Sequence, residues 1–228
     1  MRRFAVIGLG RFGQKLAVAL AMSGAEVIAI DKDRAVVENL RDQVTLAVRL
    51  DSTDEDALKS QDIDKVDVAI IGIGQGHGGF EAGILTVVNL KNLGIEQIYA
   101  RAESLIAGQV FSAVGATEVI YPEIESAQRW AYKLIAPQIS EKIDFVPGYS
   151  LAKFEAPPSF DNKTIQELHF RQKYGVNLVL ITRGQRGKKM KEEKSDIINI
   201  PLPETVIFEG DILMAAGSDA DLARLGQI

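Results

Sequence analysis

The sequence predicts an α/β protein, with a doubly wound parallel sheet followed by a smaller C-terminal α+β domain. Two observations carry this prediction. Short apolar runs alternate with segments of helical spacing over residues 4–121, which is typical of βαβ units. A different pattern of shorter strands and helices follows after residue 145.

The first half contains regularly alternating elements. Residues 4–7 are a short apolar run ending at Gly8 and predict a buried strand. Further strands are expected over residues 26–30, 44–48, 66–71, 97–101 and 118–121. Helices are expected over residues 11–23, 34–43, 54–60, 79–93 and 105–114. The last of these helices has Gly115 as its expected C-cap.

The second half begins with a helix from Pro122 to about residue 139. Residues 145–149 interrupt the pattern with Pro147 and Gly148 and predict a domain boundary. We therefore expect a nucleotide-binding domain over residues 1–121, a crossover helix and linker over 122–144, and a C-terminal domain over 145–228. Within that domain, strands are expected over residues 149–156, 176–182, 206–208 and 211–216, and helices over 164–170 and 219–225. Residues 183–194 form a basic, hydrophilic segment.

The composition excludes several classes of function. The chain of 228 residues has no cysteine, which rules out disulfides and thiolate chemistry. Its net charge of −5 argues against a nucleic-acid partner. No apolar stretch approaches the roughly 18 residues of a membrane span, so we expect a cytoplasmic protein without direct membrane insertion. Only His77 and His169 are available for imidazole chemistry, and a flexible loop position is the favoured interpretation of His77.

A glycine loop of the GxGxxG type, residues 8–13, lies between the first strand and the first helix. Gly8 permits a tight turn, Gly10 lets a pyrophosphate approach the backbone, and Gly13 lets the helix pack on the sheet. Phosphates would then lie at the helix N-terminus. Asp31, at the end of the second strand, can accept hydrogen bonds from ribose hydroxyls. The sequence therefore predicts an adenine nucleotide site, against the alternative of a glycine turn with a helix-capping Asp.

Other positions refine the expected ligand. Arg11 is placed to meet a terminal phosphate or is a solvated residue at a helix start. Residues 51–53 contact the adenine edge, cap the next helix, or both. Arg101 reaches a distal phosphate or forms a surface ion pair. The candidate nucleotide-binding residues are Gly8, Gly10, Arg11, Phe12, Gly13, Asp31, Lys32, Asp51, Ser52, Thr53, Ile73, Gly74 and Arg101.

Glu123 and Glu125 follow Pro122 at the start of the long helix. Early carboxylates suit a helix N-terminus, and composition alone favours that interpretation. The alternative is that they bind a divalent cation such as Ca²⁺ or Mg²⁺. Two carboxylates make a poor site, so nucleotide phosphates or a second subunit would have to complete it.

Together these features closely resemble the RCK proteins (regulators of K⁺ conductance) of the KtrA/TrkA type. The matching segments are residues 6–13, 30–31, 51–54, 115–123, 168–178 and 210–213. The resemblance implies a cytoplasmic, non-enzymatic regulatory subunit of a Ktr/Trk-type membrane potassium channel or transporter. It implies homodimers assembled into a ring, for which we expect an octamer, and ATP, ADP or NAD(H) as ligands. It also implies that Arg11 meets the terminal phosphate and that Glu123, with its neighbour Glu125, binds a cation at a dimer interface.

The C-terminal segment resembles the TrkA-C module. Some relatives bind cyclic di-AMP at the dimer interface of this module. The corresponding positions here are Arg171, Val176, Asn177 and Leu178. The resemblance therefore implies dimerisation and a cyclic dinucleotide site at these positions.

An NAD-dependent oxidoreductase is the main alternative, because the glycine loop and Asp31 suit it equally. Tyr149 and Lys153 have the spacing of a short-chain dehydrogenase pair. They fall in an expected strand, where this spacing does not align the side chains as a helix would. We interpret the match as a coincidence. A redox-sensing DNA-binding repressor would need a winged helix and a basic face, and the sequence shows neither.

Overall fold

The computed structural model describes residues 2–74, 76, 78–135, 139–183 and 196–225. The chain divides into two compact units, residues 1–125 and 126–228. The division falls inside one helix, α6 (Pro122–Ile135).

The N-terminal unit contains a six-stranded parallel sheet in the order β3-β2-β1-β4-β5-β6. Its strands are β1 (Arg3–Ile7), β2 (Glu26–Asp31), β3 (Leu46–Arg49), β4 (Val68–Ile71), β5 (Gln97–Arg101) and β6 (Glu118–Ile120). The direction of winding reverses between β1 and β4. Ligands of doubly wound sheets bind at such a reversal, beyond the carboxyl ends of the strands. The predicted fold of this half is confirmed.

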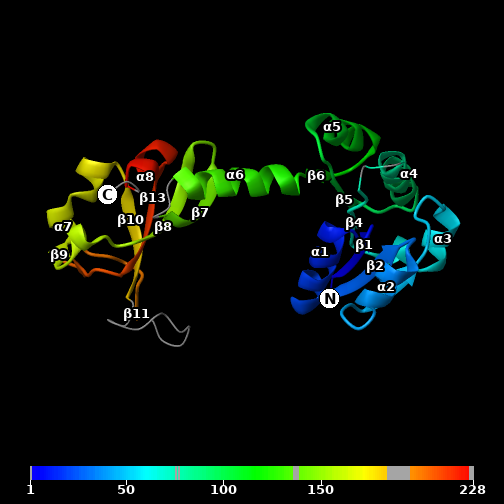
Figure 1. Ribbon diagram of the computed structural model, residues 1–228, viewed down its shortest axis with the longest axis horizontal. Helices are drawn as coiled ribbons and strands as arrows, with labels where there is room; N and C mark the ends of the chain where they lie inside the picture. The colour runs from blue at the N-terminus through cyan, green and yellow to red at the C-terminus, as the bar shows by residue number, and fades with distance from the viewer. Residues whose placement is uncertain (1, 75, 77, 136–138, 184–195, 226–228) are drawn as a thin grey trace. The chain divides into compact units, whose positions relative to one another are not determined.

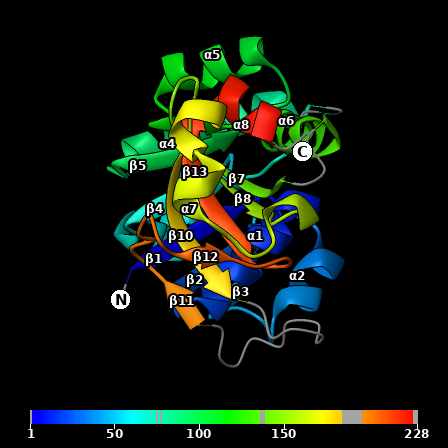
Figure 2. The same ribbon diagram turned by 90° about the vertical axis from the view of Figure 1, so that its left-hand side faces the viewer.

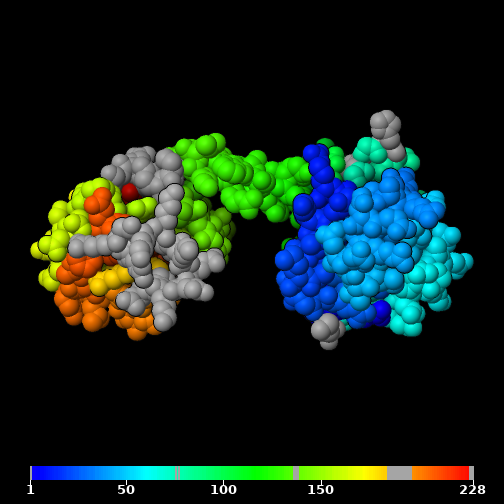
Figure 3. Space-filling view, turned by 60° about the horizontal axis from the view of Figure 1, so that its bottom comes forward, coloured from blue at the N-terminus to red at the C-terminus, as the bar shows by residue number. Residues whose placement is uncertain are grey.

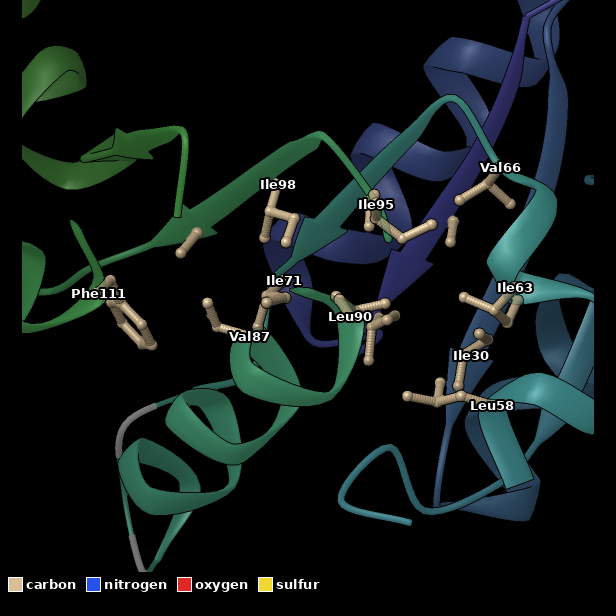
Figure 4. Close-up of a cluster of buried hydrophobic side chains, with 14 of the residues drawn as sticks. Ile30, Leu58, Ile63, Val66, Ile71, Val87, Leu90, Ile95, Ile98 and Phe111 are labelled. Carbon is tan, nitrogen blue, oxygen red and sulfur yellow. The ribbon is translucent and has the colours of Figure 1, made fainter. Parts of the chain in front are cut away.

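Helices cover both faces of this sheet (Figure 1). On one face, α1 (Arg11–Met22) and α2 (Arg34–Leu40) bury Ala17, Val37 and Leu40. On the other face lie α3 (Glu55–Ser60), η1 (Ile63–Lys65), α4 (Gly79–Asn92) and α5 (Leu105–Val114). Figure 4 shows Leu58 of α3 beside Ile30 of β2, and Val87 of α4 beside Ile71 of β4. Burial of these side chains holds the strand ends, and therefore the site, in place.

Local signals in the sequence explain where these helices start and end. Asp33 caps α2 by accepting a hydrogen bond from the N–H of Ala35, and Asp54 caps α3 through the N–H of Ala57. Ser104 caps α5 in the same way. Gly115 follows α5 with a φ of 121°, so its expected role as C-cap is confirmed.

The C-terminal unit contains a five-stranded sheet in the order β11-β10-β13-β8-β7. Its strands are β7 (Ile139–Val146), β8 (Tyr149–Glu155), β10 (Asn177–Arg183), β11 (Asp196–Ile198) and β13 (Ile212–Ser218). Figure 2 shows β10 and β13 side by side. The short strands β9 (Lys163–Thr164) and β12 (Val206–Ile207) pair with each other. The remaining elements are η2 (Pro158–Phe160), α7 (Ile165–Leu168), the π-helical turn η3 (Phe170–Tyr174) and α8 (Asp219–Leu225).

The structure differs from the sequence-based expectation around residue 145. Residues 145–149 do not separate two units: Phe145 and Val146 end β7, and Pro147 and Gly148 form the turn to β8. Gly148 has a φ of 82°, the conformation that such a tight turn requires. A Pro-Gly pair marks a hairpin turn as readily as a linker, which explains the difference.

The helix after Pro122 is also shorter than expected. α6 ends at Ile135, and Ile139 is already the buried first residue of β7. No residue of α6 is buried in this single chain, and the space-filling view shows its side chains at the surface (Figure 3). Trp130 and Leu134, the expected apolar stripe, are 53% and 75% exposed. The expected helix over residues 164–170 is interrupted at His169, which has a φ of 48°. Residues 184–194 of the basic segment lie outside the described residues.

Candidate nucleotide-binding site

The glycine loop at the end of β1 has the close packing that its sequence predicts. Gly8 has a φ of 87°, and a Cβ atom added there would lie 2.6 Å from the backbone nitrogen of Ile73. A Cβ atom at Gly13 would collide with the carbonyl oxygen of Gly8. Gly10 has nothing within 4 Å of its Cβ position. Gly8 and Gly13 therefore serve the fold, while Gly10 leaves space open.

Asp31 connects this loop to the end of β2. Its Oδ2 atom accepts a hydrogen bond of 2.6 Å from the N–H of Leu9, and its Oδ1 atom accepts one of 2.9 Å from the N–H of Asp33. Each carboxylate oxygen keeps a second lone pair for a ligand. Asp33, not Asp31, caps α2. Asp31 is thus a support of the glycine loop as well as a candidate ligand residue.

A cavity of about 360 Å³ opens over the glycine loop, large enough for a nucleotide. The candidate residues that line it are Gly8, Gly10, Asp31, Lys32, Asp51, Ser52, Thr53, Ile73 and Gly74. The chain also contributes Leu50, Gly76, Gly78, Gly79 and Ala82, which the sequence analysis did not select. The structure brings these residues together from the ends of β1, β2, β3 and β4 and from the start of α4.

The loop of residues 51–53 forms one wall of this cavity. The N–H and the hydroxyl of Thr53 both donate to Oδ1 of Asp51, at 3.0 and 2.7 Å. These hydrogen bonds, and the nearby charge of Lys32, hold the pKa of the Asp51 carboxyl below its usual value. Asp51 is therefore a charged hydrogen-bond acceptor at neutral pH. The cap of α3 is the next residue, Asp54.

Four candidates do not line the cavity: Arg11, Phe12, Gly13 and Arg101. Gly13 is buried beneath the loop, and Arg11 is exposed in the first turn of α1. No side chain caps α1, whose N-cap is Gly10. This leaves the helix N-terminus open to an anion, next to the Arg11 guanidinium. His77 lies outside the described residues.

Arg101 forms ion pairs at the end of β5. Its Nη2 atom lies 2.6 Å from Oε1 of Glu123 and 3.3 Å from Oε1 of Glu103. The guanidinium of Arg101, and more weakly that of Arg11, lowers the pKa of the Glu123 carboxyl. Of the two alternatives for Arg101, the structure therefore shows an ion pair, in which the Arg101 side chain is 14% exposed and that of Glu123 is 61% exposed.

The two glutamates of α6 have partners within the chain. Besides the Glu123 pair, Oε1 of Glu125 accepts a hydrogen bond of 3.3 Å from the N–H of Tyr121 at the helix start. Among the residues that the structure describes, no group of three or more His, Asp or Glu side chains is arranged to hold a metal ion. Within one chain, Glu123 therefore pairs with Arg101 of β5, and Glu125 accepts from the backbone at the helix start.

The C-terminal unit has a second cavity, of about 290 Å³. Its lining includes Arg171 and Leu178, two of the four residues considered for a cyclic dinucleotide, together with His169. Val176 is fully buried in the core of the unit and Asn177 is exposed outside the cavity lining. The structure thus brings only part of that group together.

Comparison with known proteins identifies the family of the chain. The model of the TrkA-N domain matches residues 4–122, and that of the TrkA-C domain matches residues 151–228. The chain is 34% identical over 223 residues to the Ktr system potassium uptake protein C of Bacillus subtilis, covering 98% of this chain and 95% of the relative. The chain belongs to the TrkA/Ktr family of RCK proteins.

The solved structures that resemble this RCK chain include the following two. The GsuK RCK domain matches 99% of it with a TM-score of 0.59 at 18% identity, and the chain spans 47% of that longer chain. This likeness shows the shared fold. The NAD(P)-binding domain of an exopolyphosphatase-related protein from Archaeoglobus fulgidus matches 59% of the chain and 98% of its own length, with a TM-score of 0.50 and 25% identity. Among the described residues of our RCK chain, no helix is both long and apolar enough to cross a membrane.

Proposed function

We propose that this chain is a cytoplasmic regulatory subunit that binds an adenine nucleotide in the glycine-loop cavity and gates a Ktr/Trk-type membrane potassium channel or transporter. The observation that carries the proposal is this cavity, at the reversal between β1 and β4, in a chain related over 98% of its length to a Ktr potassium uptake protein. In the proposed assembly, homodimers form an octameric ring at the inner face of the membrane, and the partner supplies all contact with the bilayer.

The chemistry of the cavity favours ATP or ADP, with NAD(H) as a further ligand. Asp31 offers carboxylate lone pairs to a ribose, and Gly10 leaves room for phosphates beside the open N-terminus of α1. The similarity to an NAD(P)-binding domain supports a dinucleotide equally. Arg11 favours ATP or ADP over a dinucleotide, because its exposed guanidinium at the start of α1 suits the extra charge of a terminal phosphate.

The arrangement of Tyr149 and Lys153 favours a regulator over an oxidoreductase. Both residues lie on strand β8, where four residues span about 13 Å, so the two side chains do not form the helical pair of a dehydrogenase. Lys153 instead lies 3.9 Å from Oε2 of Glu141. Hydride transfer to an alcohol or 2-hydroxy acid by the pure protein would contradict the proposal.

The test is potassium uptake by vesicles that contain the chain and its co-purified membrane subunit. Uptake should differ between ATP and ADP, and Arg11→Ala should reduce this difference. The physical reason is that Arg11 contacts only the phosphate that ADP lacks, so calorimetry should show ATP binding about tenfold weaker and ADP binding little changed. Equal weakening of ATP and ADP would mean that Arg11 does not contact the terminal phosphate. Uptake that is independent of both the chain and the nucleotide would contradict the proposed function.

Glu123, with Glu125 beside it, stays a proposed ligand for a divalent cation. The cation would need nucleotide phosphates or a second subunit as additional ligands, and it would compete with Arg101 for the Glu123 carboxylate.

We also propose the C-terminal cavity as a site for cyclic di-AMP. Arg171 supplies a positive charge at its lining and Leu178 an apolar surface. On this basis Arg171→Ala should weaken cyclic di-AMP binding by about tenfold in calorimetry on the full chain, with ATP binding unchanged as the control. Binding of cyclic di-AMP that is insensitive to Arg171→Ala would exclude this cavity.

A further inference from the structure

Two polar side chains of α4, Thr86 and Asn89, contact the loop of residues 51–53. The hydroxyl oxygens of Ser52 and Thr86 lie 2.7 Å apart, with Ser52 7% and Thr86 0% exposed. The Asn89 side-chain amide donates to the carbonyl oxygens of Ser52 and Thr53, at 3.2 and 2.9 Å. The same helix also lines the cavity through Gly79 and Ala82. These hydrogen bonds therefore tie two segments that line the nucleotide cavity, α4 and the 51–53 loop, to each other.

The network fixes the direction of the hydroxyl protons. Thr86 donates its single proton to the carbonyl oxygen of Ala82, at 2.8 Å. In the Ser52–Thr86 hydrogen bond, Ser52 must then be the donor. The Thr53 hydroxyl donates to Asp51. The side chains of residues 51–53 therefore offer a ligand only acceptor lone pairs, namely those of the Asp51 carboxylate and of the two hydroxyl oxygens.

We infer that Thr86 and Asn89 are positioning residues that hold the 51–53 loop as a wall whose side chains only accept hydrogen bonds, and that these side chains select a purine with a 6-amino group over one with a 6-oxo group. The inference rests on the proposed function, in which the cavity binds a purine nucleotide. A 6-amino group donates to such a wall. A 6-oxo oxygen in the same place meets these side chains acceptor to acceptor, which disfavours binding.

The test is calorimetry of ATP and ITP binding to the full-length chain, because these nucleotides differ in the 6-substituent and in the proton on N1. The wild type should prefer ATP. Thr86→Val should lower the ratio of ATP to ITP affinity by about tenfold, because the Ser52 hydroxyl is then free to turn and donate to the 6-oxo group. Asn89→Leu should lower the ratio in the same direction, because the loop loses two hydrogen bonds. Thr86→Ser keeps the hydroxyl and should keep the ratio.

Asn92→Leu is the matched control. Asn92 lies on the same helix, and its amide donates to Oε2 of Glu55 at 3.1 Å, at the surface and outside the cavity lining. It should change neither affinity by more than about twofold. A purely structural role for Thr86 and Asn89 would weaken ATP and ITP by the same factor, and that result would overturn the inference. If Thr86→Val does not fold, Asn89→Leu and Thr86→Ser decide the question. A wild type that binds neither nucleotide would instead contradict the proposed function.

Discussion

Replacing Gly13 with alanine is expected to destabilise the N-terminal unit by about 3 kcal/mol and to abolish nucleotide binding. The added methyl group would collide with the carbonyl oxygen of Gly8. Gly8 cannot move away, because its N–H donates to the carbonyl oxygen of Ile30 at 2.8 Å and a Cβ at its own position would meet Ile73. The strain must therefore be relieved by shifting α1 or the loop. Thermal unfolding and ATP calorimetry on the same preparation measure both effects.

Gly10→Ala separates binding from folding in the same loop. Gly10 has a φ of −66° and ψ of −171°, which alanine adopts freely, and its Cβ position is open. The free energy of unfolding of the variant should lie within about 1 kcal/mol of that of the wild type. Its affinity for ATP should nevertheless be at least about tenfold lower, because the methyl group occupies the space that the phosphates need. If Gly10→Ala bound ATP normally, the phosphates would have to lie elsewhere.

Much of this site could be predicted from the sequence because its determinants are local. The glycine spacing dictates a turn followed by a helix. A parallel sheet brings the carboxyl ends of its strands to one edge, and Asp31 and residues 51–53 therefore line one cavity with Gly8. The side chain of Arg11 is different: its local sequence places it at the start of α1, but what it contacts depends on a ligand and on further subunits.

What could not be predicted depends on contacts between distant residues. Thr86 is an ordinary polar residue in a helical pattern, and only the packing of α4 against the end of β3 places its hydroxyl opposite Ser52. Arg101 and Glu123 are 22 residues apart, and their pairing follows from β5 and β6 being neighbours in the sheet. The β7–β8 hairpin was missed because its turn residues, Pro147 and Gly148, also suit a linker.

Asp31→Asn is expected to weaken ATP binding by about a hundredfold and to destabilise the unit by about 2 kcal/mol. Both oxygens of the Asp31 carboxylate accept hydrogen bonds from backbone N–H groups, one from Leu9 in the glycine loop and one from Asp33. An asparagine has only one oxygen, so its NH₂ group must face one of these N–H donors. The glycine loop then loses its support or a backbone donor stays unpaired, and a ribose loses its charged acceptor. ATP calorimetry and urea unfolding measure the two losses.

Asp33→Asn is the matched control, because it removes the same charge two residues away. Asp33 accepts the N–H of Ala35 as the cap of α2, and asparagine caps a helix as well as aspartate does. Stability and ATP affinity should both stay close to those of the wild type. If the two variants weakened ATP binding equally, the cause would be the loss of negative charge near the cavity. A loss specific to Asp31→Asn would tie ATP binding to the Asp31 carboxylate itself, and because this carboxylate also holds the N–H of Leu9, occupation of the site would bear directly on the conformation of the glycine loop.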